Sequence, residues 1–145
     1  MGFQINTKTL RDAVELANNA VSRKTTNPIL SGVKLYLEDN VLHIFTTDLQ
    51  TGFHKWLKVE DADGPFSTVV EQRVFLEILS SLSSETVRID LDGVVKLSGG
   101  NSNFKLPMMD PEEFPALTFD VSGNAILLDK NIVSKMIDKV LFCVL

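Results

Sequence analysis

One pattern recurs along the chain and limits what it can fold into: a short extended stretch that runs directly into an amphipathic helix. The three copies are predicted at residues 3–6 with 7–22, 66–70 with 71–82, and 125–128 with 129–142. In each predicted helix, four apolar residues follow the i, i+3, i+4, i+7 spacing of one helical stripe. These quartets begin at Leu10, Phe75 and Val133, so the copies are 65 and 58 residues apart. Such spacing is typical of a chain built from copies of one unit.

Predicted strands follow each of the first two helices. Alternating apolar and polar residues place them at 32–37, 41–46, 53–59, 86–91, 94–98 and 103–106. Tight turns are expected at Asp39-Asn40, Asp92-Gly93 and Gly99-Gly100, and Asp63-Gly64-Pro65 interrupts the chain between the units. Each unit is therefore a strand, a helix and three strands, at about residues 1–64 and 65–121.

One such unit has too few elements to bury both faces of its sheet. Two units with their helices side by side on antiparallel sheets form a two-layer α+β domain with one core. We therefore predict a first domain at residues 1–121 and the first strand and helix of an incomplete second domain at 122–145. Thr7 and Asp129 are the expected N-caps of the first and third helices.

Composition narrows the class of protein. The chain has 145 residues, 44% of them hydrophobic, and no apolar run approaches the roughly 18 residues of a membrane span. The N-terminus lacks the plan of a signal peptide. The single cysteine, Cys143, excludes an intrachain disulfide and is typical of the reducing cytoplasm. It lies in an apolar run, so we expect a buried, inert thiol.

The net charge is −5, but positive charge is concentrated in two segments. Residues 7–24 carry four basic and two acidic residues, and residues 130–139 carry three basic and one acidic. The rest of the chain has seven basic and 16 acidic residues. Since both positive segments fall mainly on predicted helices, we expect cationic helices and an acidic remainder. This uneven distribution is the first functional indication in the sequence.

No pattern in the sequence predicts catalysis or a cofactor. His43 and His54 lie on predicted strands with no third ligand at metal-binding spacing, and we interpret them as structural. Asp110, Glu112 and Glu113 cluster in a Pro-flanked linker, without the supporting residues that a two-metal nuclease needs. Phosphate-binding loops, dinucleotide fingerprints and nucleophile elbows do not occur. We expect a protein that is not an enzyme and has no metal.

Four local motifs, in order, identify the chain as similar to a known family. They are Asn27-Pro28-Ile29-Leu30, Thr47-Asp48-Leu49, the run from Ser98-Gly99 through Phe104 to Leu106-Pro107-Met108, and Asp110-Pro111-Glu112-Glu113-Phe114-Pro115-Ala116-Leu117. Together with the duplicated plan, they resemble the bacterial DNA polymerase III beta subunit, the sliding clamp, across essentially the whole chain. The resemblance implies the DNA-clamp fold, in rings of six similar domains from two chains arranged head to tail.

In such rings the helices line a channel and cross the phosphate backbone without reading bases, which agrees with the expected charge division. The resemblance implies a phosphate contact at Lys24, with Arg23 beside it. Lys8 and Arg11 on the first helix are further candidates, and so are Lys135 and Lys139 on the third. For each, a solvated surface charge is the alternative.

The resemblance also implies an interface between chains. Phe104 and Leu106 alternate on a predicted edge strand, where the family makes apolar contacts with a neighbouring chain; core packing is the alternative. Arg73 is a candidate for an ion pair across that interface, although Asn101 and Asn103 stand where relatives often carry arginines.

The predicted function is that of a non-catalytic processivity factor that encircles duplex DNA and tethers the replicative polymerase. Expected partners are duplex DNA, a second clamp subunit, and the polymerase and clamp loader through later domains, with no membrane. Since the family binds partner peptides between its second and third domains, we expect these 145 residues neither to close a ring nor to bind such peptides. The alternative is an interaction module of the same architecture with no role on DNA.

Overall fold

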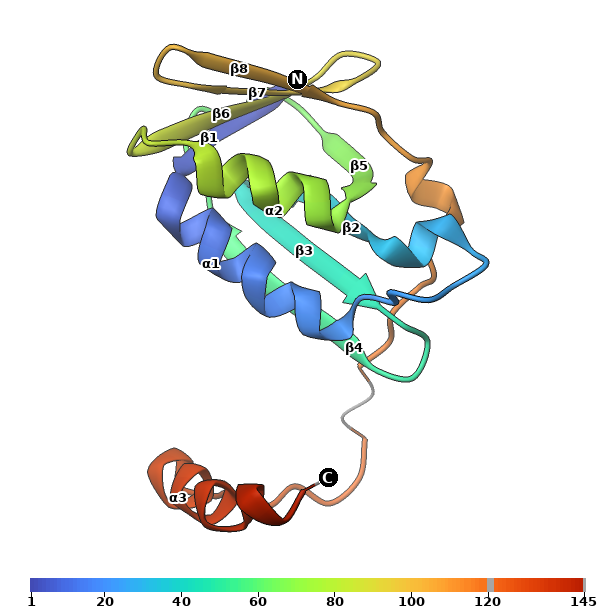
Figure 1. Cartoon of the computed structure of the whole chain (residues 1–145), viewed down its shortest axis with the longest axis vertical. Helices are drawn as coiled ribbons and strands as arrows, with labels where there is room; N and C mark the ends of the chain where they lie inside the picture. Colours follow the sequence, from blue (N-terminus) through green and yellow to red (C-terminus); the bar gives the residue numbers. More distant parts are fainter. Residues whose placement is uncertain (120–121, 145) are drawn as a thin grey trace.

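A computed structural model describes residues 1–119 and 122–144 of the chain (Figure 1). The elements of the first repeat are β1 (Gly2–Asn6), α1 (Thr7–Ala17), the 3₁₀ turns η1 (Asn18–Ala20) and η2 (Pro28–Ser31), β2 (Gly32–Glu38), β3 (Val41–Thr47) and β4 (Gly52–Lys58). Those of the second are β5 (Phe66–Glu71), α2 (Gln72–Ser81), β6 (Thr86–Leu91), β7 (Val95–Gly99), β8 (Ser102–Leu106) and η3 (Pro111–Glu113). The order strand, helix, three strands therefore occurs twice, which confirms the predicted duplication.

The two units exchange their first strands. One four-stranded antiparallel sheet, sheet A, has the order β1-β6-β7-β8, and the other, sheet B, has the order β4-β3-β2-β5. Thus β1 pairs with β6 of the second unit, with Ile5 opposite Val87, and β5 pairs with β2 of the first, with Val33 opposite Val70. Because each sheet contains strands of both units, neither unit is complete without the other.

Each exchanged strand is covered on its outer edge by the segment that follows the last strand of its own unit. Gln4 of β1 forms a bridge with Glu60, and Val69 of β5 forms one with Met109. The equivalent bridges show that the duplication extends to the connecting segments. In the part of the chain that the structure describes, β4 and β8 remain as the unpaired edges, one on each sheet.

The helices α1 and α2 lie side by side on the same side of the two sheets (Figure 1). Their apolar stripes enter one core, in which Leu10 of α1 and Phe75 of α2 are completely buried. The side-chain amide of Gln72, itself buried, donates to the Val14 carbonyl over 3.0 Å and ties the two helices together. This is the predicted two-layer α+β arrangement, with two helices packed on antiparallel sheets.

The first helix differs from its predicted bounds. It ends at Ala17 and continues as a single 3₁₀ turn, whereas the sequence predicts a helix over residues 7–22. Its N-cap is Asn6 and not Thr7: the Asn6 side-chain oxygen accepts from the Thr9 amide over 2.9 Å, while Thr7 is the first helical residue and is buried. The Asp39-Asn40 turn is confirmed, since both residues have positive φ angles, as a primed hairpin turn requires.

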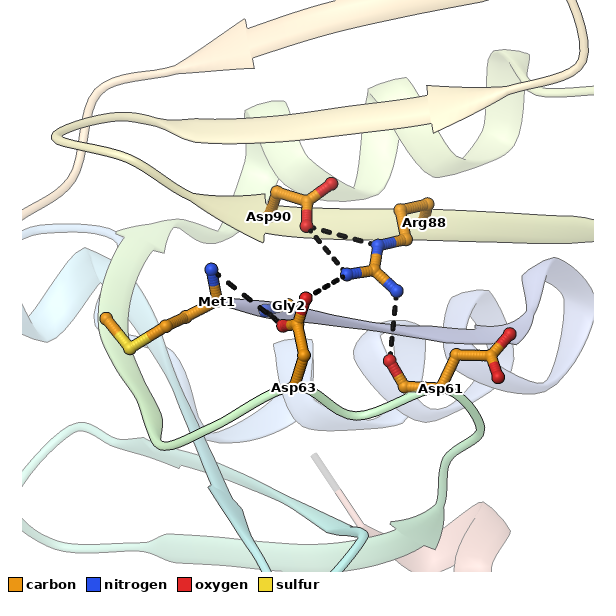
Figure 2. A network of polar contacts seen from close by, with 6 residues as sticks. All are labelled: Met1, Gly2, Asp61, Asp63, Arg88 and Asp90. Carbon is orange, nitrogen blue, oxygen red and sulfur yellow. Dashed lines mark hydrogen bonds and ion pairs between the residues drawn. The ribbon is translucent and has the colours of Figure 1, made fainter.

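An ion-pair network joins the two units at the start of the chain (Figure 2). The Arg88 guanidinium on β6 lies 2.9 Å from Asp63 and 3.0 Å from Asp90, and it donates to the Asp61 carbonyl over 2.9 Å. The Gly2 amide donates to the Asp63 carboxylate, and this bond is the main reason that the pKa of Asp63 is lowered. The network therefore connects the inter-unit loop to both partners in the β1–β6 pair.

The third copy of the pattern forms a helix but no strand. Residues 125–128, predicted as a strand, have no regular structure, because a strand requires a pairing neighbour. The helix α3 (Lys130–Val140) begins at its predicted N-cap, Asp129, and is followed by η4 (Leu141–Cys143). Neither element buries any residue, so the prediction of a buried Cys143 is wrong: this thiol is exposed.

The predicted domain boundary at residue 121 and the last residue, Leu145, lie outside the described residues. Within the described ranges, no helix is long and apolar enough to cross a membrane.

Candidate nucleic-acid interface

Two of the predicted phosphate contacts lie on α1, on the layer formed by the two paired helices. Lys8 is exposed in the first turn. Arg11 is half-buried, and its Nε lies 3.9 Å from the neighbouring Asp12 carboxylate, so part of its charge is already compensated. Lys8 is therefore the freer cation of the two.

The expectation of cationic helices is wrong for the paired units. In α1, two basic residues are balanced by Asp12 and Glu15, and in α2 a single basic residue is balanced by Glu77. Of the three α-helices in the described residues, only α3 carries net positive charge, with Lys130, Lys135 and Lys139 against one acidic residue. The excess positive charge of residues 7–24 comes from Arg23 and Lys24, which lie beyond the end of α1 and also beyond the helix predicted over residues 7–22.

Arg23 and Lys24 lie in the loop between η1 and η2, and both are exposed. The base of this loop is closed by a hydrogen bond from the Ser22 amide to the Leu30 carbonyl over 3.0 Å. At the far end, the Asn27 side chain accepts from the Ile29 amide and caps η2. These bonds hold both ends of the loop and leave its two cations projecting into solvent.

The same loop borders a hollow between the end of α1 and the start of α2. Arg23 from the loop and Arg73 from α2 both line it, together with Glu71 and Glu77. The Arg73 guanidinium is paired with Glu77 at 3.1 Å, and the Glu71 carboxylate caps α2 by accepting from two amides. Among the residues that the structure describes, Arg23 and Lys24 have no ion-pair partner, so they are the cations available to an anionic ligand here.

Lys135 and Lys139 are exposed one turn apart on α3. Figure 1 shows this helix apart from the layer of α1 and α2. The structure therefore does not bring these two lysines together with the loop cations, and their role as phosphate contacts stays a prediction.

The predicted subunit interface lies on a true edge strand, since β8 is the last strand of sheet A. Leu106 is only 3% exposed and packs in the core, which matches the core-packing alternative. Phe104 is half-buried and packs against the same core, so part of its ring remains available. Arg73 lies on α2 and pairs within its own helix. Contacts of these three residues with another chain stay predictions.

Two further findings concern possible metal ligands and the two histidines. Among residues 1–119 and 122–144, no cluster of three or more His, Cys, Asp or Glu side chains could hold a metal ion. His43 and His54, interpreted as structural, do contact each other, with His43 Nδ1 3.0 Å from His54 Nε2. The pairing of residues on different strands could not be read from their sequence spacing alone.

Comparison with known proteins gives a consistent result. Residues 1–118 match the family model of the DNA polymerase III beta subunit, N-terminal domain. The beta sliding clamp of Bacillus subtilis is 28% identical over 153 residues, which cover 99% of this chain and 40% of that protein. A beta sliding clamp sequence from Vibrio harveyi is 28% identical over 144 residues, which cover 98% of this chain and 99% of that sequence.

Solved structures agree with these matches. The DNA polymerase III beta subunit of Thermotoga maritima superposes with a TM-score of 0.88 at 28% identity, over 97% of this chain and 39% of that one. The corresponding subunit of Pseudomonas aeruginosa gives a TM-score of 0.87 at 26% identity, over 95% of this chain and 38% of that one. The chain thus spans about 40% of the length of most of the relatives that it matches.

Proposed function

The chain belongs to the DNA polymerase III beta subunit family, and from this premise we propose that it forms part of a sliding clamp, a ring that encircles duplex DNA and tethers the replicative polymerase without catalysing a reaction. The observation that carries the proposal is the match of residues 1–118 to the N-terminal domain of that family, on a structure that reproduces its duplicated architecture. In this proposal residues 1–121 are the first domain and residues 122–145 begin the second.

The layer of α1 and α2 is the surface that we assign to DNA. Its helices carry no net charge, so the attraction to phosphate comes mainly from the exposed Arg23 and Lys24 beside them, with Lys8 and Arg11 as secondary contacts. Phosphate contacts of this kind carry no sequence information, which suits a protein that must slide. The acidic remainder of the chain disfavours DNA on other surfaces.

Other partners follow from the same assignment. The free edge of β8, with Phe104 beside it, would pair with a second clamp subunit, while the polymerase and the clamp loader would bind domains beyond those described. We place the protein in the cytoplasm, where replication takes place in bacteria.

A domain replacement tests the proposal. Residues 1–118 replace the matching N-terminal domain of the Bacillus subtilis clamp, and the hybrid ring is loaded onto circular and linear duplexes of equal length. A clamp domain should give a ring that stays on circular DNA in high salt and dissociates when the DNA is linearised. Retention that does not depend on DNA topology would instead favour an interaction module of the same architecture.

The loop cations allow a second measurement on the hybrid ring. Reversal of both charges in the double variant Arg23→Glu, Lys24→Glu should weaken binding to duplexes of any sequence. It should also reduce the salt dependence by about one unit of slope for each phosphate that the ring no longer binds. The matched control within residues 1–118 is Lys58→Glu, an exposed lysine of β4 on the face of sheet B away from the helices, which should leave the salt dependence unchanged. A double loop variant with an unchanged salt slope would exclude the loop as a phosphate contact.

A further inference from the structure

Aromatic rings line the outer face of sheet B, on the side away from α1. His43 and Phe45 project from β3 and His54 from β4. The Phe45 and His54 rings are nearly parallel, with centroids 4.3 Å apart, and Phe119 stacks against His54 at 5.9 Å. Trp56 lies 5.5 Å from His54. The rings of His43, Phe45, His54 and Phe119 are called the aromatic column here.

Phe119 does not belong to the sheet but to a segment that crosses it. This strap, residues 114–119, begins at Phe114, which is buried beside Val69 in a small core of its own. It continues over Gly52, where an added Cβ would stand 3.6 Å from both Leu117 and Phe119. The aromatic column therefore holds the far end of the strap, while the small core holds its beginning.

The two histidines form a direct hydrogen bond inside the column. Their facing nitrogens, His43 Nδ1 and His54 Nε2, are 3.0 Å apart, and the ring planes differ by only 21°. Because the ring centroids are 5.3 Å apart, each ring extends away from the shared contact. This is the geometry of an in-plane hydrogen bond, in which one nitrogen donates its N–H to the lone pair of the other.

We propose that the His43–His54 pair is a proton-sensitive latch on the strap: one added proton leaves the bridge intact, and a second breaks it and releases Phe119. A neutral pair has one lone pair in the bridge and one outside it. The first proton binds the outer lone pair and makes the bridge charge-assisted, hence stronger. The second can bind only the bridging lone pair, so two N–H groups and two positive charges then face each other.

The surroundings favour the neutral side of this equilibrium. Lys34 and Tyr36 share the face on β2, and Lys58 shares it on β4. Lys55 lies beside His54 at the strand edge. Within the strap itself, residues 114–119 contain no charged side chain, and no carboxylate among the described residues forms an ion pair with either ring.

Burial of the ring, and next the charge of His43, lower the pKa of His54. A lowered pKa in the folded state means that the neutral ring is favoured by folding. Its stabilising contribution is therefore complete above the ordinary histidine pKa of about 6.5 and is lost as the pH falls through the folded value. Release of the strap is accordingly an acid response.

The test is an NMR titration of the full chain, which contains only two histidines, so that single variants assign each imidazole signal. In the unmodified protein, the two rings should titrate in steps more than about one pH unit apart. The backbone NMR order parameters of residues 116–119 should fall at the lower step, because Phe119 no longer holds the end of the strap against His54. His43→Gln should move the titration of His54 to higher pH.

Two variants test the histidine pair and the Phe119 contact separately. In His54→Gln, the order parameters of the strap should lose their acid step. In Phe119→Ala, the order parameters of the strap should be low at every pH while the two histidine steps remain, and this variant serves even if His54→Gln does not fold. Histidines that titrate independently, with His43→Gln leaving the midpoint of His54 unmoved, would overturn the shared proton. Separate steps without any change in the order parameters of the strap would overturn the latch.

Discussion

The helices α2 and α3 carry the same apolar spacing, but they differ in what covers it. Leu79, the third residue of the stripe on α2, is completely buried, whereas Ile137, at the matching position of α3, is 53% exposed. Both helices begin at an acidic N-cap and are of nearly equal length. The comparison teaches that an amphipathic stripe specifies which face will be buried, while the partner that buries it must come from elsewhere in the fold.

The largest expected difference comes from truncating the two matched side chains. Leu79→Ala should lower the free energy of unfolding by about 2–5 kcal/mol, because it leaves a cavity in a packed core. Ile137→Ala should change it by less than about 0.5 kcal/mol, because the side chain is already in water. Urea unfolding monitored through Trp56, the only tryptophan, measures both. Equal effects would mean that α3 is packed in solution.

The N-caps of α1 and α3 allow a second matched comparison, for which the expected effect on stability is smaller. Asn6→Ala on α1 and Asp129→Ala on α3 each remove a side-chain acceptor for backbone amides, which is worth about 1 kcal/mol. For α1 the loss should appear as lower stability of the whole domain. For α3 it should appear only as lower helix content in circular dichroism, with the urea midpoint of the domain unchanged. A midpoint shift in Asp129→Ala would show that the two regions unfold together.

The weakest expected effect concerns the network that joins the paired units. The pKa of Asp63 is lowered, first by the Gly2 amide and then by nearby positive charges that include Arg88. Its contribution to stability is therefore present above the ordinary aspartate pKa of about 3.9 and is lost as the pH falls through the folded value. In Asp63→Asn, the free energy of unfolding should therefore fall less steeply as the pH is lowered through the acid range. The matched control, Asp138→Asn on α3, should leave the pH dependence of the free energy of unfolding unchanged.

Much of the local structure could be predicted because it depends on neighbouring residues. The Asp39-Asn40 turn, the Asp129 cap and the three helices are all visible in patterns of a few residues, as is the edge strand that carries Phe104. The end of α1 is not, because apolar residues at Ala20 and Val21 continue the helical spacing although the chain has turned into a 3₁₀ form. Arg23 and Lys24 lie in a loop in either case, because the predicted helix also ends before them.

The candidate interface could be predicted only in part. The positive charge of residues 7–24 is correct as a sum, but Asp12 and Glu15 balance it within α1, so the excess lies on the loop. The hollow that places Arg23 and Arg73 on one surface joins residues about 50 positions apart, so no local pattern could have revealed it. The His43–His54 bond likewise depends on a strand register that alternation alone does not supply.

The amino-acid sequence by itself determined the repeated unit, the secondary structure of the first two copies and the apolar face of each helix, since periodicity, caps and turns act over a few residues. Only the tertiary structure decided that β1 and β5 are exchanged between the units, that Leu106 belongs to the core, and that residues 125–128 remain unpaired. The physical reason is that a strand or an apolar stripe gains its stability from hydrogen bonds and burial supplied by distant segments.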